Sequence, residues 1–371
     1  MRIALSLLAL RPGQVGGAET YVRALVRHLP AAAAGDELLL VLDRDLDRTI
    51  EAPGWTKVVM PYGARELVAR RIAEAYAPWR DRRSEAVLAA ARPDVTLHPQ
   101  QSIFPREPPG AAVLTVVDVQ HLHHPENFGL FDRTFRPRVY PRSLARADRV
   151  IAISEFTLRT LAGRCALSPG KGVVIPLGVD PAPPGTGPPL PVGLAPDRFL
   201  YCPAATWPHK GHDRLIAAYG ALRRGGRVTD RLVLTGQRTP LWKRELQPLA
   251  RRLGIEGDVL HLGFVPRPTV DALLSMARAV VFPTRYEGFG LPVVEAANAG
   301  GRIVASRLEV FDEIGLPREN QVDFEDPESV AAALALPRPT RLLREPLSWA
   351  EVARRTAEVL RATGSGPGWP R

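Results

Sequence analysis

The chain has 371 residues, of which 45% are hydrophobic and 24% charged, a balance typical of soluble globular proteins, and its length favours two domains over one core. The net charge of +10 comes mainly from arginine, and the accompanying wealth of Ala, Pro and Gly is typical of GC-rich codon usage. No nucleic-acid-binding motif and no run of about 18 apolar residues is found, so we expect neither a nucleic acid partner nor a membrane-spanning helix.

The first ten residues are predicted to form a buried strand. They superficially resemble a signal peptide, but they lack a basic segment and a small-x-small cleavage site, and they run into a glycine turn. The two cysteines, Cys165 and Cys202, show no metal-ligand spacing. We therefore expect a reducing, cytoplasmic location, with peripheral contact at the inner face of a membrane left open.

Short apolar runs alternate with helical patterns through the first half of the chain. This alternation predicts a parallel sheet built from βαβ units. A helix is predicted over 18–29, where apolar residues recur at helical spacing. The predicted strands cover residues 3–10, 37–43, 57–61, 94–98, 111–117, 149–153 and 172–177.

A glycine-rich loop, residues 13–19, joins the first predicted strand to the first helix. It lacks the Gly-x-Gly-x-x-Gly spacing of a dinucleotide site and the lysine of a P-loop. Such a loop is often only a turn. Its place at the sheet edge nevertheless makes Gly16 and Gly17 candidates for contacting a diphosphate or an acceptor.

Asp118 follows the strand predicted over 111–117 and precedes three histidines, His121, His123 and His124. These side chains are metal-ligand types, but no further ligands at helical spacing accompany them, so we expect no metal. Asp118 is instead interpreted as an acceptor-binding or sugar-binding group at the end of a strand.

Two other stretches of the first half are interpreted as ordinary surface. Asp43 and Asp45 imitate an Asp-x-Asp metal motif, but we expect them in a solvated loop after a strand. The arginine-rich segment 65–83, which includes Trp79, is compatible with a membrane-touching basic helix. A solvated helix face is the preferred interpretation.

Residues 181–191 are rich in proline and glycine and are predicted to be a linker. After it the alternation restarts, so we predict two Rossmann-like domains that face a cleft, with ligands outside the carboxyl ends of the strands. The predicted parts are 1–178 (first domain), 179–196 (linker), 197–345 (second domain) and 346–371 (C-terminal helix). Strands are predicted over 198–203, 231–235, 258–263, 279–283 and 302–306, and helices over 211–224, 241–253, 268–277 and 292–299.

The most informative stretch is Tyr286 to Glu295, which joins the strand predicted over 279–283 to a helix. Its turn holds Gly288 and Gly290, which tolerate positive φ and close ligand approach. A helix N-terminus that directly follows such a turn offers free N–H groups and a positive dipole end, which suit an anion. The stretch carries a carboxylate in the turn, Glu287, and another one turn into the helix. A nucleotide sugar has the phosphate and hydroxyl groups that fit this combination.

Lys210 is the second candidate of this half. It follows the strand predicted over 198–203 and precedes a helix, so it lies at the same sheet edge as Glu287. Most lysines are merely solvated, but this chain has only four, and a lysine here can neutralise a diphosphate leaving group. At the C-terminus, Ser348 and Glu351 fit a capping box that opens a terminal helix.

These motifs, in this order, resemble retaining glycosyltransferase family 4. The glutamate, seven residues and glutamate of Glu287 to Glu295 match the family signature, and the similarity extends over most of the chain outside the linker and the extreme C-terminus. It includes the Gly16-Gly17 loop, Asp118 with 125–128, 152–155, 175–180, 208–211 and 347–349.

The resemblance implies a GT-B fold, with the acceptor bound by the N-terminal domain and the nucleotide sugar by the C-terminal domain. It implies that the terminal helix crosses back to the first domain. It assigns Glu295 to the ribose, Glu287 to the sugar hydroxyls and Lys210 to the diphosphate, without a metal or other cofactor. The remaining donor-binding candidates are Gly288, His209 and the backbone amides of Phe289, Gly290 and Leu291.

Two positions depart from the family pattern. Ala204 stands where related enzymes often carry an arginine. Either a neighbouring residue such as His209 or Arg238 supplies the missing charge, or the diphosphate is held less tightly. Val117 stands where many relatives carry a histidine before the aspartate, which leaves the acceptor side less defined.

We therefore predict a retaining transferase that moves a hexose from a GDP-mannose or UDP-glucose type donor to a hydroxyl of a glycan, lipid-linked or small-molecule acceptor. The alternatives are a non-catalytic protein that binds a sugar nucleotide and a nucleotide-sugar epimerase.

Overall fold

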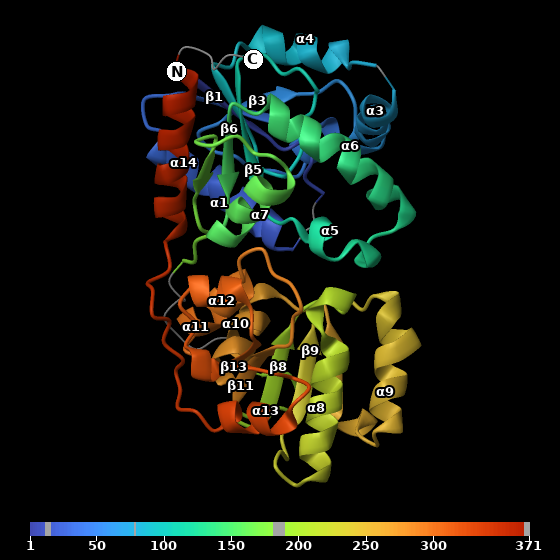
Figure 1. The fold of residues 1–371 in the computed structure, drawn as a ribbon. Coiled ribbons are helices and arrows are strands. Elements are labelled where there is room, and N and C mark those ends of the chain that lie inside the picture. Colours follow the sequence, from blue (N-terminus) through green and yellow to red (C-terminus); the bar gives the residue numbers. More distant parts are fainter. Residues whose placement is uncertain (12–15, 78, 181–189, 367–371) are drawn as a thin grey trace. The chain divides into compact units, whose positions relative to one another are not determined.

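The computed structural model describes residues 1–11, 16–77, 79–180 and 190–366, which form two compact units. Unit 1 contains Met1–Gly178 and Leu347–Arg371, and unit 2 contains Val179–Pro346. In each unit, helices cover a parallel sheet (Figure 1). Residues 13–15 of the glycine-rich loop and 181–189 of the proline-rich linker lie outside the described residues.

The sheet of unit 1 has seven parallel strands in the order β3-β2-β1-β4-β5-β6-β7. All seven strands predicted in the first half are confirmed. The strand predicted over 3–10 ends at Ser6, because Leu10 turns back to donate to the carbonyl of Leu7. The strands are β1 (Arg2–Ser6), β2 (Glu37–Leu42), β3 (Thr56–Val59), β4 (Val95–His98), β5 (Ala111–Val116), β6 (Arg149–Ala152) and β7 (Gly172–Val174).

The helices of unit 1 include one whose start sequence analysis misinterpreted. Asp43 does not lie in a solvated loop: it is fully buried, and its carboxylate accepts hydrogen bonds from the backbone of Asp45 and Leu46 as a helix cap. The helices are α1 (Gly17–Ala32), α2 (Arg44–Asp47), α3 (Ala64–Tyr76), α4 (Arg82–Ala91), α5 (Gln120–His123), α6 (Leu130–Arg146), α7 (Glu155–Arg164) and α14 (Trp349–Gly364), with the 3-10 turn η1 (Pro125–Asn127).

The terminal helix α14 belongs to unit 1, as the family resemblance implies, and it packs along α1 (Figure 1). The ring of Trp349 lies 6.3 Å from that of Tyr21. The Ser348 hydroxyl caps the helix by accepting from the Glu351 backbone N–H at 3.1 Å. The Glu351 carboxylate is engaged by two arginines further along α14, which lower its pKa to about 2.

The sheet of unit 2 has six parallel strands in the order β10-β9-β8-β11-β12-β13. All five predicted strands are present. The sixth, β13, has only two residues, too few for a recognisable apolar run. The strands are β8 (Phe199–Pro203), β9 (Arg231–Thr235), β10 (Val259–Gly263), β11 (Ala279–Phe282), β12 (Ile303–Ser306) and β13 (Gln321–Val322).

The helices of unit 2 flank this sheet, and all four that the sequence predicts are present. The one predicted over 241–253 begins as a wider π-helical segment, η3 (Trp242–Leu246), and continues as α9 (Gln247–Arg252). The others are η2 (Pro208–Lys210), α8 (His212–Arg224), η4 (Glu256–Asp258), α10 (Arg267–Met276), α11 (Leu291–Asn298), α12 (Glu309–Glu313), η5 (Arg318–Asn320) and α13 (Pro327–Leu334).

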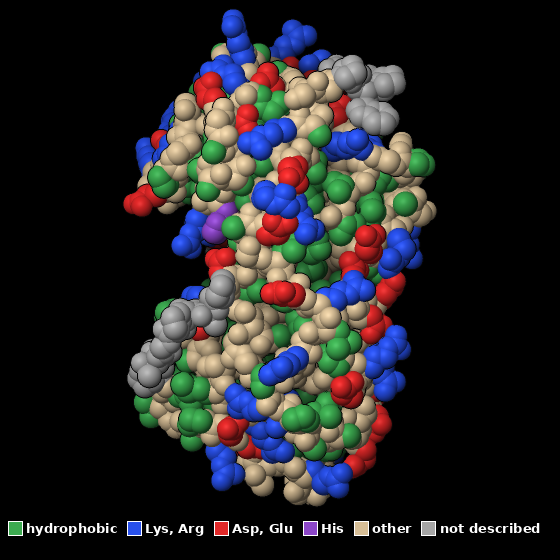
Figure 2. All heavy atoms as spheres, turned by 90° about the vertical axis from the view of Figure 1, so that its left-hand side faces the viewer, with side chains coloured by type: hydrophobic (Ala, Val, Ile, Leu, Met, Phe, Trp, Pro, Cys, Tyr) green, Lys and Arg blue, Asp and Glu red, His purple; other side chains and the backbone are tan. Residues whose placement is uncertain are grey.

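The surface carries charges of both signs. On the face drawn in Figure 2, basic and acidic side chains alternate and form no broad patch of a single sign. Among the residues that the structure describes, no helix has the length and apolarity needed to cross a membrane.

Candidate functional site

Lys210 and Glu287 lie at the point where the strand order of unit 2 reverses. β8 is the central strand, with β9 on one side and β11 on the other. At such a switch point the loops after the two neighbouring strands leave in opposite directions and open a crevice at the carboxyl edge. Here the loop after β8 carries Lys210, and the loop after β11 carries Glu287.

The two loops are joined by backbone contacts that require glycine at position 211. Gly211 has φ +67°, and a Cβ atom there would lie 2.0 Å from the carbonyl oxygen of Pro283. The Arg285 backbone N–H donates to the carbonyl of His209 at 2.7 Å, which ties the loop after β11 to the loop after β8. The Arg285 guanidinium also pairs with Asp213 through two hydrogen bonds of 2.8 and 2.6 Å. Sequence analysis did not single out this pair.

Lys210 and Glu287 form an ion pair in which Nζ lies 2.6 Å from Oε1. The two side chains are only 20% and 14% exposed. A pair shielded in this way is held more firmly than a surface salt bridge, although desolvation opposes the attraction. The ammonium has three donors, so it can hold Glu287 and still bind a second oxygen.

Helix α11 begins beside this pair at Gly290, whose φ of +95° lets the chain turn sharply into the helix. A Cβ atom at Gly290 would lie 2.7 Å from the ring of Phe311. The turn residues Gly288 and Phe289 precede it, and Leu291 is the first helical residue. The first backbone N–H groups of a helix have no partner within the helix, and its positive dipole end favours anions.

A pocket of about 180 Å³ lies at the same edge, beyond the ends of β8, β9 and β10. Glu295 lines it, and its Oε1 accepts from the Arg267 guanidinium at 2.6 Å. Arg267 also donates to Asp271 at 2.8 Å, and both carboxylates raise the pKa of the guanidinium against the effect of burial. Sequence analysis missed Arg267. The only signal available was its position four residues after a strand and four before an aspartate.

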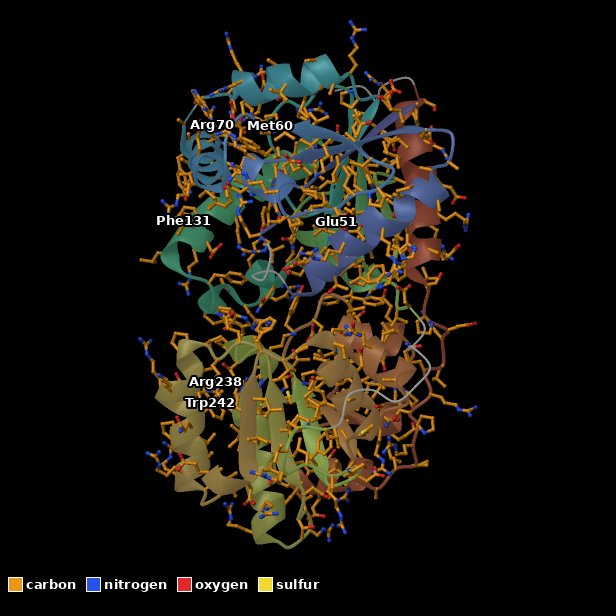
Figure 3. The ribbon with its side chains drawn as sticks, turned by 180° about the vertical axis from the view of Figure 1, so that it is seen from behind. Glu51, Met60, Arg70, Phe131, Arg238 and Trp242 are labelled. Carbon is orange, nitrogen blue, oxygen red and sulfur yellow. The ribbon has the colours of Figure 1, made fainter. Side chains whose placement is uncertain are left out.

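Ala204, the position of the missing arginine, also lines this pocket. Arg238 follows β9 and donates to the backbone carbonyl of His261. Its side chain lies near Trp242 at the edge of the unit (Figure 3). In this structure the Arg238 guanidinium is therefore engaged in joining β9 to β10.

The other predicted site residues lie at the carboxyl edge of the unit 1 sheet, whose strand order reverses between β1 and β4. Gly16 has φ +51° and precedes α1, which begins at Gly17. Asp118 follows β5, and its Oδ1 accepts from the Gln120 backbone N–H at 3.1 Å. The Asp118 carbonyl accepts from the Gln101 side chain at 2.8 Å, which ties the loop after β5 to the loop after β4.

The histidines after Asp118 are part of the packing of unit 1. The His121 ring meets the Tyr140 ring edge-on at 5.0 Å, and burial lowers the pKa of His121 to about 4. Within the described ranges, no group of three or more His, Cys, Asp or Glu side chains is arranged to hold a metal ion.

Unit 2 contains two buried histidines, and because of them we expect the folded protein to lose stability in mild acid. Burial lowers the pKa of His212 and of His261 to about 4, from 6.5 in an exposed histidine. The unfolded chain therefore binds protons at higher pH than the folded chain, so the free energy of unfolding is expected to fall as the pH drops from about 6.5 to about 4.

Urea unfolding followed by circular dichroism across this range measures the effect. His261→Asn, which keeps an acceptor for the Gly263 backbone N–H but does not titrate, should flatten the pH dependence. A slope equal to that of the native chain would contradict this account.

Comparison with known proteins places both halves of the chain among glycosyltransferases. Residues 15–183 match the family model described as Glycosyltransferase Family 4, and residues 195–338 match Glycosyl transferases group 1. The chain is 37% identical over 122 residues to the O-antigen chain mannosyltransferase B of Escherichia coli, covering 31% of this chain and 32% of that protein.

A second relative is the D-inositol 3-phosphate glycosyltransferase of Actinosynnema mirum. It is 35% identical over 183 residues, covering 44% of this chain and 42% of that protein. The chain thus spans less than half the length of either relative. Among solved structures, Anabaena HepE in complex with UDP and glucose matches with a TM-score of 0.66 and 19% identity, over 98% of this chain and all of that one. The fold is the GT-B fold.

Proposed function

We propose that this chain, which belongs to the glycosyltransferases described by these two family models, transfers a hexose from a nucleotide diphosphate sugar to a hydroxyl acceptor. The observation that carries the proposal is the Lys210–Glu287 ion pair beside the N-terminus of α11, with the Glu295 pocket at the same sheet edge. Positive charge, free backbone N–H groups and a nearby carboxylate meet the needs of a diphosphate joined to a ribose and a sugar.

The donor would occupy the carboxyl edge of unit 2. Its nucleoside would fill the pocket, with Glu295 accepting hydrogen bonds from the ribose hydroxyls. Its diphosphate would lie between Lys210 and the backbone amides of Phe289, Gly290 and Leu291. Its sugar hydroxyls would face Glu287. The mannosyltransferase relative and the HepE complex with UDP and glucose support a GDP-mannose or UDP-glucose type of donor.

The reaction breaks the bond between the anomeric carbon and the diphosphate and forms one to the acceptor oxygen. We propose transfer with retention of configuration, in which the departing diphosphate oxygen takes the acceptor proton. Lys210 and the end of α11 would stabilise the negative charge that develops on the leaving group, without a metal. In unit 1, Asp118 and the Gly16-Gly17 loop would bind the acceptor, which would be a glycan, a lipid-linked chain or a small molecule.

Glu295→Gln is expected to weaken donor binding about tenfold, because a neutral amide replaces a carboxylate that accepts hydrogen bonds from both ribose and Arg267. Titration calorimetry with UDP, GDP, UDP-glucose and GDP-mannose measures the effect. The matched control is Asp271→Asn, which removes the other carboxylate bound to Arg267. An equal loss in both variants would show that Glu295 acts only by holding Arg267.

Product analysis after incubation with each of these donors, with and without acceptors, separates transfer from the alternatives. A binding protein without activity would bind a donor but consume none with any acceptor. An epimerase would release a changed sugar or nucleotide sugar without an acceptor. Binding of none of these nucleotides would contradict the donor site itself.

A further inference from the structure

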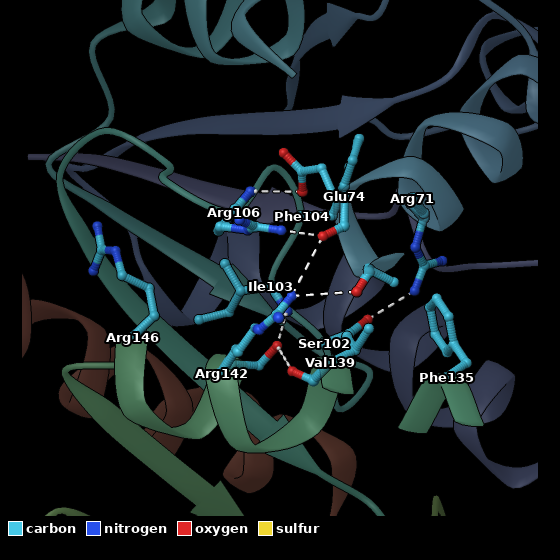
Figure 4. A pocket seen from close by; sticks show the side chains of 12 residues that line it. Arg71, Glu74, Ser102, Ile103, Phe104, Arg106, Phe135, Val139, Arg142 and Arg146 are labelled. Carbon is cyan, nitrogen blue, oxygen red and sulfur yellow. Dashed lines mark hydrogen bonds between the residues drawn. The ribbon is translucent and has the colours of Figure 1, made fainter. Parts of the chain in front are cut away.

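Unit 1 holds a second pocket, of about 40 Å³, between α3, α6 and the loop that contains Ser102 (Figure 4). Four arginines line this pocket, whereas Glu74 is the one carboxylate among its lining residues. The pocket has room for about three water molecules. It is too small for a sugar but suits one phosphate or carboxylate group.

Three of the four arginines contact backbone carbonyls or carboxylates, and these contacts account for their presence in the pocket. Arg106 and Arg142 donate to backbone carbonyls in the last turn of α3, where a helix has unpaired acceptors. Arg146 lies within 3.5 Å of both Glu107 and Asp148. The Glu74 carboxylate, in turn, accepts from the backbone N–H groups of Asp81 and Arg106, at 2.9 and 3.0 Å.

Arg71 is the exception. It donates to the Ser102 hydroxyl at 2.8 Å and forms no ion pair with a carboxylate of the described residues, although Glu74 acts on it electrostatically from the same pocket. Burial and the nearby charge of Arg11 lower its pKa to about 10. A guanidinium has five N–H donors, and a partly buried cation that no carboxylate pairs directly is unfavourable. The fold therefore leaves Arg71 without the anionic partner that such a group needs.

We propose that this pocket binds the phosphate group of a ligand, with Arg71 and Ser102 as its principal donors and Arg142 opposite them. A planar guanidinium can offer two parallel hydrogen bonds to a phosphate, which match its geometry. The site lies in unit 1 and is independent of the donor site proposed in unit 2, so either can fail without the other.

The surroundings indicate two sources for that phosphate. Phe135 lines the pocket and stacks on Phe131 at 5.3 Å. Phe131 is 51% exposed on the outer part of α6 (Figure 3), and Tyr76, 44% exposed, lies 6.5 Å from it. Exposed rings beside a phosphate pocket suit a lipid phosphate, whereas the pocket alone suits a soluble phosphate ester.

The test compares Arg71→Gln with Arg65→Gln, which removes the same charge from an exposed position on the same helix. Both changes are made in a Lys210→Ala background, so that phosphate binding in unit 2 contributes little. Inorganic phosphate is titrated by calorimetry, and co-sedimentation is measured with phosphatidylcholine vesicles with and without phosphatidic acid. Arg71→Lys, which keeps the charge but loses the planar fork, should bind with intermediate affinity.

We expect Arg71→Gln to lower phosphate affinity roughly tenfold or more, and Arg65→Gln to change it less than about twofold. The same pattern with phosphatidic acid vesicles, accompanied by loss of binding in Phe131→Ser, assigns the phosphate to a lipid. Phosphate binding without vesicle binding assigns it to a soluble ester. Absence of both, or equal losses in the Arg71 and Arg65 variants, overturns the proposal. An unchanged circular dichroism spectrum and an unchanged urea unfolding midpoint in Arg71→Gln show that the variant is folded.

Discussion

Lys210→Ala is expected to lower kcat/KM for sugar transfer by about 100- to 1,000-fold, the usual cost of removing one group that stabilises developing charge. The ammonium lies 2.6 Å from Glu287 in a partly buried pair. Its removal would take a positive charge away from the leaving diphosphate and would also leave the Glu287 carboxylate unpaired beside it. Both effects raise the energy of the transition state.

The matched control is Lys243→Ala, which removes an exposed lysine from the π-helical segment of the same unit. It should keep the rate within about twofold, as expected for a surface charge. Lys210→Arg should recover part of the rate, because the charge returns on a longer and planar group. Steady-state kinetics with the donor chosen by the nucleotide titrations measures all three. An unchanged rate in Lys210→Ala would remove Lys210 from the reaction.

Gly211→Ala is expected to destabilise unit 2 by about 2–5 kcal/mol and to abolish donor binding in the molecules that remain folded. The left-handed backbone at φ +67° costs a residue with a side chain about 1–2 kcal/mol. The new Cβ atom would also lie 2.0 Å from the Pro283 carbonyl, and such overpacking costs about 1–3 kcal/mol. Relief of that clash moves the loop after β8 away from the loop after β11 and separates Lys210 from Glu287.

Gly226→Ala measures the energetic cost of the left-handed backbone alone, without a clash such as the one with Pro283. Gly226 has φ +66°, nearly the value at Gly211, and a Cβ atom there would meet no atom within 4 Å. It should lower the free energy of unfolding by only about 1–2 kcal/mol and leave donor binding intact. Urea denaturation and calorimetry compare the two variants. Similar losses in both would indicate that the contact with Pro283 does not shape the site.

The order of strands and helices could be predicted because most strands here are buried apolar runs and the spacing of apolar residues separates them from the helices. The boundaries were less predictable. The run from Ile3 to Leu10 is apolar except for Ser6 and buried except at Ala9, but only its first part pairs as a strand. Burial selects for apolar residues in a turn as much as in a strand, so composition could not show where β1 ends.

Within the candidate site, position along the chain was enough to bring Lys210 and Glu287 to one sheet edge, because parallel strands share their carboxyl ends. The partners of these side chains were not predictable in the same way. Arg267 meets Glu295 from 28 residues away, and Arg285 meets Asp213 from 72 residues away. Because the chain has so many arginines, the sequence does not show which of them pairs with a given carboxylate. The fold is needed to identify the pair.

By itself the sequence determined the two parallel-sheet units, the presence of a terminal helix after Ser348, and the loop and helix start around Glu287. These depend on local patterns of apolar residues, glycine and proline, which act on the nearby backbone. Only the tertiary structure decided that Lys210 pairs with Glu287, that Gly211 lies against Pro283 and that Arg71 forms no ion pair with a carboxylate of the described residues. The physical reason is that ion pairs and close contacts depend on distances between strands and loops far apart in the chain, which no local pattern encodes.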